Sequence, residues 1–171
     1  KVLKEYHFCP ICQYFGNLAD YETMSIFHAY DIRGLYPQEI TPEIVEKIGA
    51  AFAQYTGAKE VVVGRDMRTS CDELFPALVA GLASRGCRVI DIGLCSTPLF
   101  YFAVLNYGKS VPGIMITASH NPAAYNGLKM VGADGMPFSG EKGLKEIEAL
   151  ITNVIPRSEA TSGSPDYQGD L

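Results

Sequence analysis

Three side chains of different chemistry follow one another near the middle of the chain. Ser119 supplies a hydroxyl, His120 an imidazole and Asn121 an amide, and Pro122 stiffens the turn directly after them. The apolar residues 113–117 precede this group and are expected to form a strand. Because ligands of open α/β sheets bind at the carboxyl ends of the strands, these three polar side chains are candidate site residues.

Two further polar segments also follow predicted strands. Residues 30–34 (Tyr-Asp-Ile-Arg-Gly) come after Ile26-Phe27, and residues 64–68 (Gly-Arg-Asp-Met-Arg) come after a run of three valines. Lys129 follows on another strand-like run. Basic groups at the ends of strands, in a chain whose net charge is −5, indicate a local site for a small anion, most simply a phosphate.

Each of these residues also has a purely structural interpretation. A Ser–His pair in a loop is more often part of a turn than of an active site. Arg65 and Asp66 are expected to form a partly exposed salt bridge, worth about 1 kcal/mol or less, that fixes their loop. Lys129 alone would be an ordinary surface lysine. The G-x-S-x-G elbow is absent and adjacent Ser119 and His120 need not point at each other, so no serine-hydrolase relay is predicted.

The composition limits the size and the class of the protein. The 171 residues (18.6 kDa) have room for one α/β domain with short flanking segments. Fourteen basic against 19 acidic residues argue against a nucleic-acid partner. No apolar stretch is long enough for a membrane span, no signal peptide is recognisable, and five scattered cysteines do not form a disulfide framework. We therefore expect a cytoplasmic protein with no membrane partner.

Helix and strand signals alternate between residues 26 and 151. Thr41 and Ser70 are expected to cap two helices, the second through a capping box over residues 70–73. These helices end at Gly57 and Gly86, and two more are expected over 97–106 and 140–151; strands are expected at 61–63, 88–93, 113–117 and 128–131. This order predicts a three-layer α/β/α domain with a small mixed, mostly parallel sheet and an antiparallel pair at one edge. Residues 1–25 would be an extension of unclear role, and 152–171 a polar linker.

Three motifs of this domain strongly resemble those of the α-D-phosphohexomutases, and most closely the phosphomannomutase/phosphoglucomutase branch. They are Phe-His-Ala-Tyr-Asp-Ile-Arg-Gly at 27–34, Thr-Ala-Ser-His-Asn-Pro at 117–122 and Tyr-Asn-Gly-Leu-Lys at 125–129. The resemblance covers residues 26–151 and implies the fold of the first domain of phosphoglucomutase. The form of residues 30–34 favours this branch over the phosphoglucosamine mutases.

The resemblance implies an isomerase that interconverts hexose 6-phosphate and hexose 1-phosphate through a bisphosphate intermediate. Ser119 would carry the phosphoryl group, and Mg²⁺ would bind through that phosphate, with its other ligands from a domain outside this chain. Lys129 would be a general acid/base or a charge clamp on the reacting hydroxyl, with Arg33 beside it. Hexose 1,6-bisphosphate would be the activator.

The same resemblance assigns the remaining candidate residues to binding. Tyr30 would face the sugar, while His120 and Asn121 would orient the loop and contact phosphate or substrate. The hexose phosphate is the implied partner.

The resemblance covers only the first of the family's four domains. The Asp-Gly-Asp-x-Asp-Arg metal loop and the sugar-recognition loops of the other domains do not occur in this sequence. We therefore expect residues 152–171 to lead toward a missing second domain, and the chain to be inactive without the remaining mutase domains.

Two alternatives remain beside this reading. The chain could be a non-catalytic phosphosugar-binding or regulatory module. Cys9 and Cys12 have the spacing of half a zinc knuckle and suggest a zinc-dependent interaction, although a structural zinc site needs four ligands.

Overall fold

The computed structural model of the chain describes residues 26–107 and 111–154. Within these ranges five strands and four helices alternate. The strands are β1 (Ile32–Leu35), β2 (Glu60–Arg65), β3 (Arg88–Leu94), β4 (Gly113–Ile116) and β5 (Tyr125–Val131). The helices are α1 (Pro42–Thr56), α2 (Cys71–Ala83), α3 (Thr97–Asn106) and α4 (Leu144–Val154). No helix of the described part of the chain is both long enough and apolar enough to cross a membrane.

The strands form one sheet in the order β1-β5-β4-β2-β3. Strand β2 pairs in parallel with β3 and β4, whereas β5 pairs antiparallel with both β4 and β1. Since β1 and β4 both oppose β5, four of the five strands run in the same direction. The predicted mixed, mostly parallel sheet is confirmed. The antiparallel β4–β5 pair, however, lies inside the sheet rather than at its edge, because β1 covers the other side of β5.

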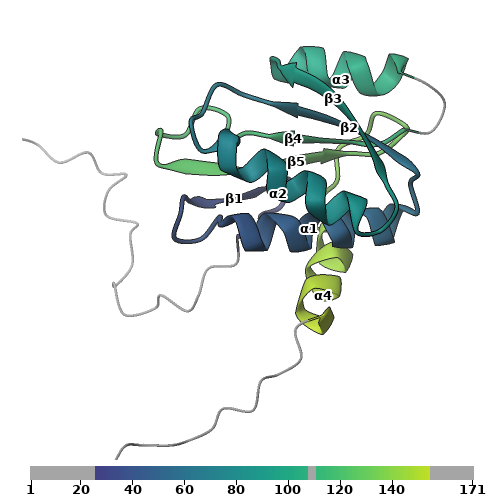
Figure 1. The fold of residues 1–171 in the computed structure, drawn as a ribbon, viewed down its shortest axis with the longest axis horizontal. Helices are drawn as coiled ribbons and strands as arrows, with labels where there is room; N and C mark the ends of the chain where they lie inside the picture. The colour runs from purple at the N-terminus through teal and green to yellow at the C-terminus, as the bar shows by residue number, and fades with distance from the viewer. Residues whose placement is uncertain (1–25, 108–110, 155–171) are drawn as a thin grey trace, which may run out of the picture.

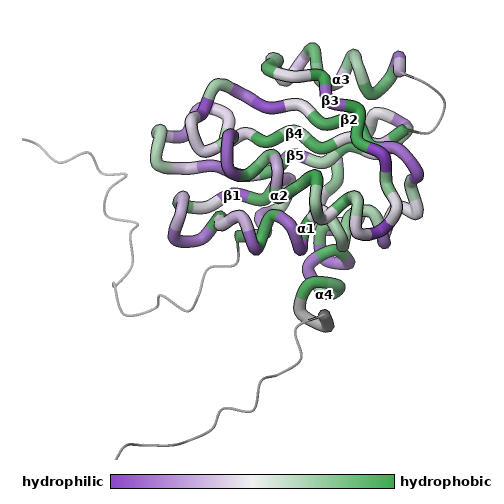
Figure 2. The backbone as a smooth tube through the Cα atoms, in the orientation of Figure 1, coloured by the Kyte–Doolittle hydropathy of each residue, from purple (hydrophilic) through white to green (hydrophobic). Residues whose placement is uncertain are grey.

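Helices cover both faces of the sheet, which confirms the three layers (Figure 1). Successive side chains of a strand point to opposite faces, so Val61 and Val63 of β2 join one core and Val62 joins the other. The larger core includes residues of α1, α2 and α4, and the smaller one packs beneath α3. Figure 2 shows hydrophobic residues on the central strands, as expected for strands buried on both faces.

Local capping signals explain the first helix. The Thr41 hydroxyl accepts a hydrogen bond from the backbone N–H of Ile44 at 3.3 Å, and Pro42 occupies the first helical position, as predicted. Gly57 ends the helix in the left-handed conformation, with φ 63°.

The predicted capping box of the second helix is wrong. Ser70 precedes α2 with helical backbone angles and makes no side-chain cap hydrogen bond. Its hydroxyl instead accepts a hydrogen bond from the side-chain amide of Asn126 at 2.7 Å. Asn126 is fully buried on β5, so its amide needs an acceptor inside the protein. Ser70 provides that acceptor, and its hydroxyl therefore does not cap the helix as the local pattern predicted.

Three predicted element bounds also differ from the structure. The first strand is Ile32–Leu35 rather than Ile26-Phe27, of which only Phe27 bridges to β1. Strand β5 begins at Tyr125, because its first half pairs with β1. Helix α4 begins at Leu144, since Ser139 forms bridges to Lys142 and Gly143 just before it. Helix α4 continues to Val154, so the predicted linker 152–171 is wrong for its first three residues. The rest of that linker and the predicted extension 1–25, with Cys9 and Cys12 within it, lie outside the described residues.

Candidate functional site

A cavity of about 780 Å³ lies at the carboxyl ends of β2, β3 and β4. Its walls are formed by residues 66–69 after β2, residues 95–98 at the start of α3, and the segment after β4. Ser119, His120 and Asn121 line it together with Lys129 of β5. The structure thus brings together in one cavity four of the six site residues that the sequence predicts.

The serine loop has an uncommon backbone conformation. Ser119 has φ 55°, and among the described residues it is the only non-glycine residue with a positive φ. Such a conformation costs about 1–2 kcal/mol for a residue with a Cβ and persists where its surroundings fix it. Here the Ser119 N–H donates to the Thr117 hydroxyl at 2.9 Å, and that hydroxyl donates to Asp66 at 2.8 Å.

Arg68 lies against the same loop from the β2 side. Its guanidinium donates to the backbone carbonyls of Ser119, Asn121, Pro122 and Tyr125 at 2.7–3.1 Å. The sequence suggested that the 64–68 segment would attract an anion. The donors of Arg68 are directed at the protein's own backbone instead.

The predicted Arg65–Asp66 salt bridge is also wrong. Arg65 pairs with Asp91 of β3 at 2.8 Å, and its guanidinium lies 4.1 Å from the centre of the Phe75 ring. Asp66 pairs with Arg68 instead, at 3.2 Å. Adjacent residues at the end of a strand point to opposite faces of the sheet, so Arg65 and Asp66 diverge.

The two predicted cations share one carboxylate. Asp31 accepts hydrogen bonds from Lys129 at 2.9 Å and from Arg33 at 2.5 Å, both through Oδ2. Burial of the Asp31 carboxyl works against its ionisation, but the hydrogen bonds and charges of Lys129 and then of Arg33 outweigh it, so that the pKa of Asp31 is lowered below its ordinary value of 3.8. Arg33 also donates to the Asn121 side chain at 3.0 Å, which links this cluster to the serine loop.

Tyr30 and Arg33 do not line the main cavity. Tyr30 is 71% exposed and borders a separate hollow of about 310 Å³ with Ala29 and residues 139–141. Arg33 reaches the cavity only through Asn121, and its buried Nε has no hydrogen-bond partner within the described residues. Tyr30 therefore borders a different hollow from the one that Ser119 lines.

No sequence pattern singled out Asp31 or Thr117 as a site residue, and none predicted that Asp66 and Arg68 would hold the serine loop. A signal for Asp31 was present, because two partly buried cations require a nearby carboxylate and Asp31 stands two residues before Arg33. The hydrogen bonds of Arg68 join residues more than 50 positions apart, and no local pattern predicts such contacts.

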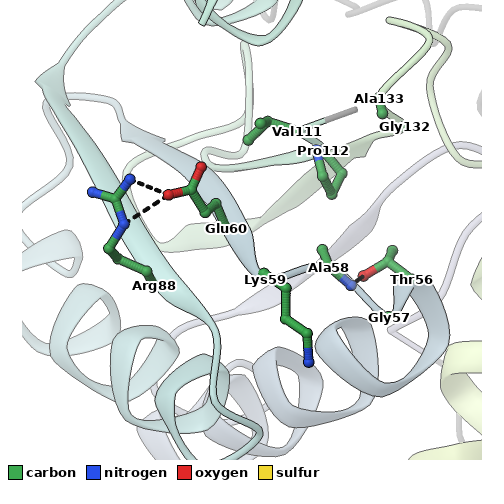
Figure 3. A pocket seen from close by; sticks show the side chains of 10 residues that line it. All are labelled: Thr56, Gly57, Ala58, Lys59, Glu60, Arg88, Val111, Pro112, Gly132 and Ala133. Atoms are coloured by element: carbon green, nitrogen blue, oxygen red, sulfur yellow. Dashed lines mark hydrogen bonds and ion pairs between the residues drawn. The ribbon is translucent and has the colours of Figure 1, made fainter. Parts of the chain in front are cut away.

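A second cavity, of about 720 Å³, lies at the amino ends of β2, β3 and β4 (Figure 3). Figure 3 shows the Glu60–Arg88 ion pair and Lys59 at its wall. None of the predicted site residues lines it. Within the described residues there is no group of three or more His, Cys, Asp or Glu side chains that could hold a metal ion.

Known proteins show the same fold and related sequences. The sequence model of the family "Phosphoglucomutase/phosphomannomutase, alpha/beta/alpha domain I" matches residues 24–157. A phosphomannomutase of Salmonella typhimurium is 41% identical over 143 residues, which cover 82% of this chain and 31% of the relative. A relative named "Probable phosphoglucosamine mutase" from Thermococcus kodakarensis is 44% identical over 125 residues, covering 73% of this chain and 27% of the relative.

Among solved structures, a phosphoglucomutase/phosphomannomutase family protein from Burkholderia thailandensis matches with a TM-score of 0.67 and 37% identity, over 75% of this chain and 30% of that protein. The chain thus spans about a third of the length of these proteins.

Proposed function

The chain belongs to the phosphoglucomutase/phosphomannomutase family as its domain I, and we propose that it is the phosphoserine-bearing domain of a hexose-phosphate mutase, with Ser119 as the phosphoryl carrier. The observation that supports this most directly is the placement of Ser119. It lies in a cavity at the carboxyl ends of the strands, at φ 55°, with the Lys129 side chain in the same cavity.

The proposed reaction interconverts hexose 6-phosphate and hexose 1-phosphate through a bisphosphate. The bond between phosphorus and the Ser119 Oγ breaks while a new one forms to a sugar hydroxyl, and the proton lost by that hydroxyl ends on the departing Oγ. The bisphosphate then returns its other phosphoryl group to Ser119. A phosphoserine carries about −1.5 to −2 charges, so cationic groups nearby stabilise both the resting state and the transfer.

Lys129 is the first candidate for this neutralisation, and it would either clamp the charge or move the hydroxyl proton. Its ammonium holds one hydrogen bond to Asp31, which leaves further N–H donors for a phosphate. Arg33 would add a second positive charge from beyond Asn121. His120 is exposed at the cavity and would contact phosphate or substrate.

Asn121 and Tyr30 are proposed to contribute to substrate binding. Arg33 donates to the side-chain oxygen of Asn121 and so orients this side chain. The NH₂ group of Asn121 would then be available to a ligand in the cavity. Tyr30 would face a sugar that extends beyond the cavity, toward the hollow next to residues 139–141.

A magnesium ion would need ligands that the described residues do not group together. Asp66, a carboxylate lining the cavity, is already engaged by Arg68 and Thr117. The chain would offer the metal the phosphate on Ser119, and another domain of the mutase would supply the remaining ligands. The residues after α4, from 155 onward, would then connect this domain to the next one.

A domain replacement tests the proposal. Residues 24–157 replace the matching segment of the Salmonella typhimurium phosphomannomutase, and the conversion of mannose 1-phosphate and glucose 1-phosphate is measured. We expect the chimera to be active, to carry one phosphoryl group by intact mass, and to lose both properties in the Ser119→Ala variant. Ser84→Ala, an exposed serine at the end of α2 that lines neither the cavity nor the hollow beside Tyr30, is the matched control. Full turnover in Ser119→Ala contradicts the proposal, and binding of hexose phosphate without any phosphorylation favours a non-catalytic phosphosugar module.

A further inference from the structure

All five N–H donors of the Arg68 guanidinium are accounted for by acceptors of the protein. Nε donates to the Asp66 carboxylate at 3.2 Å. Nη1 donates to the carbonyls of Pro122 and Tyr125 at 2.8 and 2.9 Å, and Nη2 to those of Ser119 and Asn121 at 3.1 and 2.7 Å. An arginine offers five donors in a rigid fork, so this side chain has no N–H left for a ligand.

The peptide groups on both sides of Ser119 are held by this same cluster. The Ser119 N–H donates to Thr117, whose hydroxyl donates to the Asp66 oxygen that also accepts from Arg68. The Ser119 carbonyl accepts from Arg68 directly. Asp66 is itself fixed to the end of β4, because its backbone N–H donates to the Ile116 carbonyl at 3.0 Å. Hydrogen bonds at the Ser119 N–H and at its carbonyl therefore hold the positive φ of this residue.

We propose that Arg68 is a positioning residue for phosphoryl transfer: it holds the backbone from Ser119 to Tyr125 in the conformation that directs the Ser119 hydroxyl into the cavity, and it does not bind the phosphate itself. The inference rests on the role proposed above for Ser119. It distinguishes Arg68 from Lys129, whose ammonium retains donors for a ligand.

The Arg68→Lys variant distinguishes the effect of the positive charge from the effect of the planar guanidinium and its five donors. The ammonium of Arg68→Lys keeps the positive charge opposite Asp66 but offers three donors from one point, so it cannot reach four carbonyls spread over the loop. Arg65→Lys is the matched control. Arg65 stands three residues earlier, and its side chain pairs with Asp91 of β3 and lies over the Phe75 ring.

The first experiment measures amide hydrogen exchange residue by residue in the full 171-residue chain. In Arg68→Lys we expect the amides of Ser119, Asn121 and Tyr125 to exchange at least tenfold faster, while the amides of α1 and β2 stay within twofold of the wild type. Arg65→Lys should leave the loop unchanged. Unchanged loop exchange in Arg68→Lys overturns the proposal, and so does a uniform acceleration across the domain, since Arg68 would then stabilise the whole fold.

The second experiment asks whether free guanidinium can replace the missing Arg68 side chain. In Arg68→Ala, free guanidinium at low, non-denaturing concentration should slow exchange of the loop amides again, whereas ammonium at the same concentration should not. Absence of rescue, or equal rescue by both ions, contradicts a role for the planar fork. If Arg68→Ala does not fold, Arg68→Gln takes its place for the exchange comparison, and loss of folding in all three variants overturns the proposal.

The third experiment uses the active chimera. Because Arg68 has no donor for substrate, Arg68→Lys should lower kcat at least tenfold and leave KM within about threefold. A rise in KM at constant kcat would instead make Arg68 a substrate-binding residue and overturn the proposal. If the wild-type chimera shows no turnover, the function proposed for Ser119 fails, while the exchange measurements still decide whether Arg68 holds the loop.

Discussion

The Asp31 carboxylate lies 2.9 Å from the Lys129 ammonium, although the two residues are 98 positions apart in the sequence. The antiparallel pairing of β1 with β5 brings them together, because Ile32 stands opposite Leu128 in that ladder. The same Asp31 oxygen accepts from Arg33, so one partly buried negative charge orders two cations. The carboxylate thereby offsets the repulsion that the two adjacent cations exert on each other.

This relationship makes the stability of the domain depend on pH in a predictable way. The pKa of Asp31 is lowered in the folded state, so the unfolded chain takes up the proton first as the pH falls. The contribution of Asp31 should be complete above about pH 5 and should be lost as the pH falls below 3.8 toward the folded pKa. Urea unfolding of the wild type and of Asp31→Asn at several pH values measures it.

We expect Asp31→Asn to lower the free energy of unfolding by about 1–3 kcal/mol near neutral pH, and this difference to shrink at acidic pH. The exposed Glu141→Gln variant should show a small difference that does not follow this course. A difference for Asp31→Asn that is constant with pH, or that grows as the pH falls, would show that the folded state does not favour the ionised carboxyl.

Substitution of Lys129 distinguishes its two proposed roles. In the chimera, Lys129→Met removes both the charge and the proton-transfer group and should lower kcat by a factor of about 10²–10⁴. Lys129→Arg keeps the charge, so it should retain most activity if Lys129 is a charge clamp and should resemble Lys129→Met if it moves the proton. Folding of each variant is checked by circular dichroism. Full activity of a folded Lys129→Met variant would remove this residue from the mechanism.

Gly127 allows β1 to approach β5. A Cβ at this position would lie 2.0 Å from the Ile32 carbonyl oxygen and 3.0 Å from the Arg33 Cα, so an alanine must push β1 away. Gly127→Ala should lower the free energy of unfolding by about 1–3 kcal/mol, as measured by urea unfolding. It should also weaken phosphate binding in the chimera, because Arg33 moves with the strand.

Gly140→Ala is the matched control for that change, since the nearest atom to a Cβ there is 3.8 Å away, in ordinary contact. We expect it to change the free energy of unfolding by less than about 0.5 kcal/mol. An equal loss of unfolding free energy in Gly127→Ala and Gly140→Ala would contradict the interpretation that Gly127 allows the close approach of β1 to β5.

The sequence predicted the elements whose signals are local. Helix α1 has its cap at Thr41 and its stop at Gly57, both within one turn of the residues that they serve, and both are confirmed. Strand β1 could not be located in this way, because its four residues are stabilised by pairing with a strand some 90 residues later in the chain. For the site, the serine loop and Lys129 were identified by their motifs. The contacts of Asp31, Asp66 and Arg68 follow from strand order and register, which no short pattern contains.

Ser70 and Asn126 provide the clearest test of a tertiary contact that replaces a local signal. The Asn126 amide donates to the Ser70 hydroxyl at 2.7 Å, and Ser70 makes no cap hydrogen bond. If this contact determines the role of Ser70, the effects of Ser70→Ala and Asn126→Ala on the free energy of unfolding should not add, and the double-mutant cycle should give a coupling of about 1 kcal/mol. A helix cap would instead give additive effects. Thr41→Ala, at a cap that the structure does show, should cost about 1 kcal/mol and should add to Asn126→Ala without coupling.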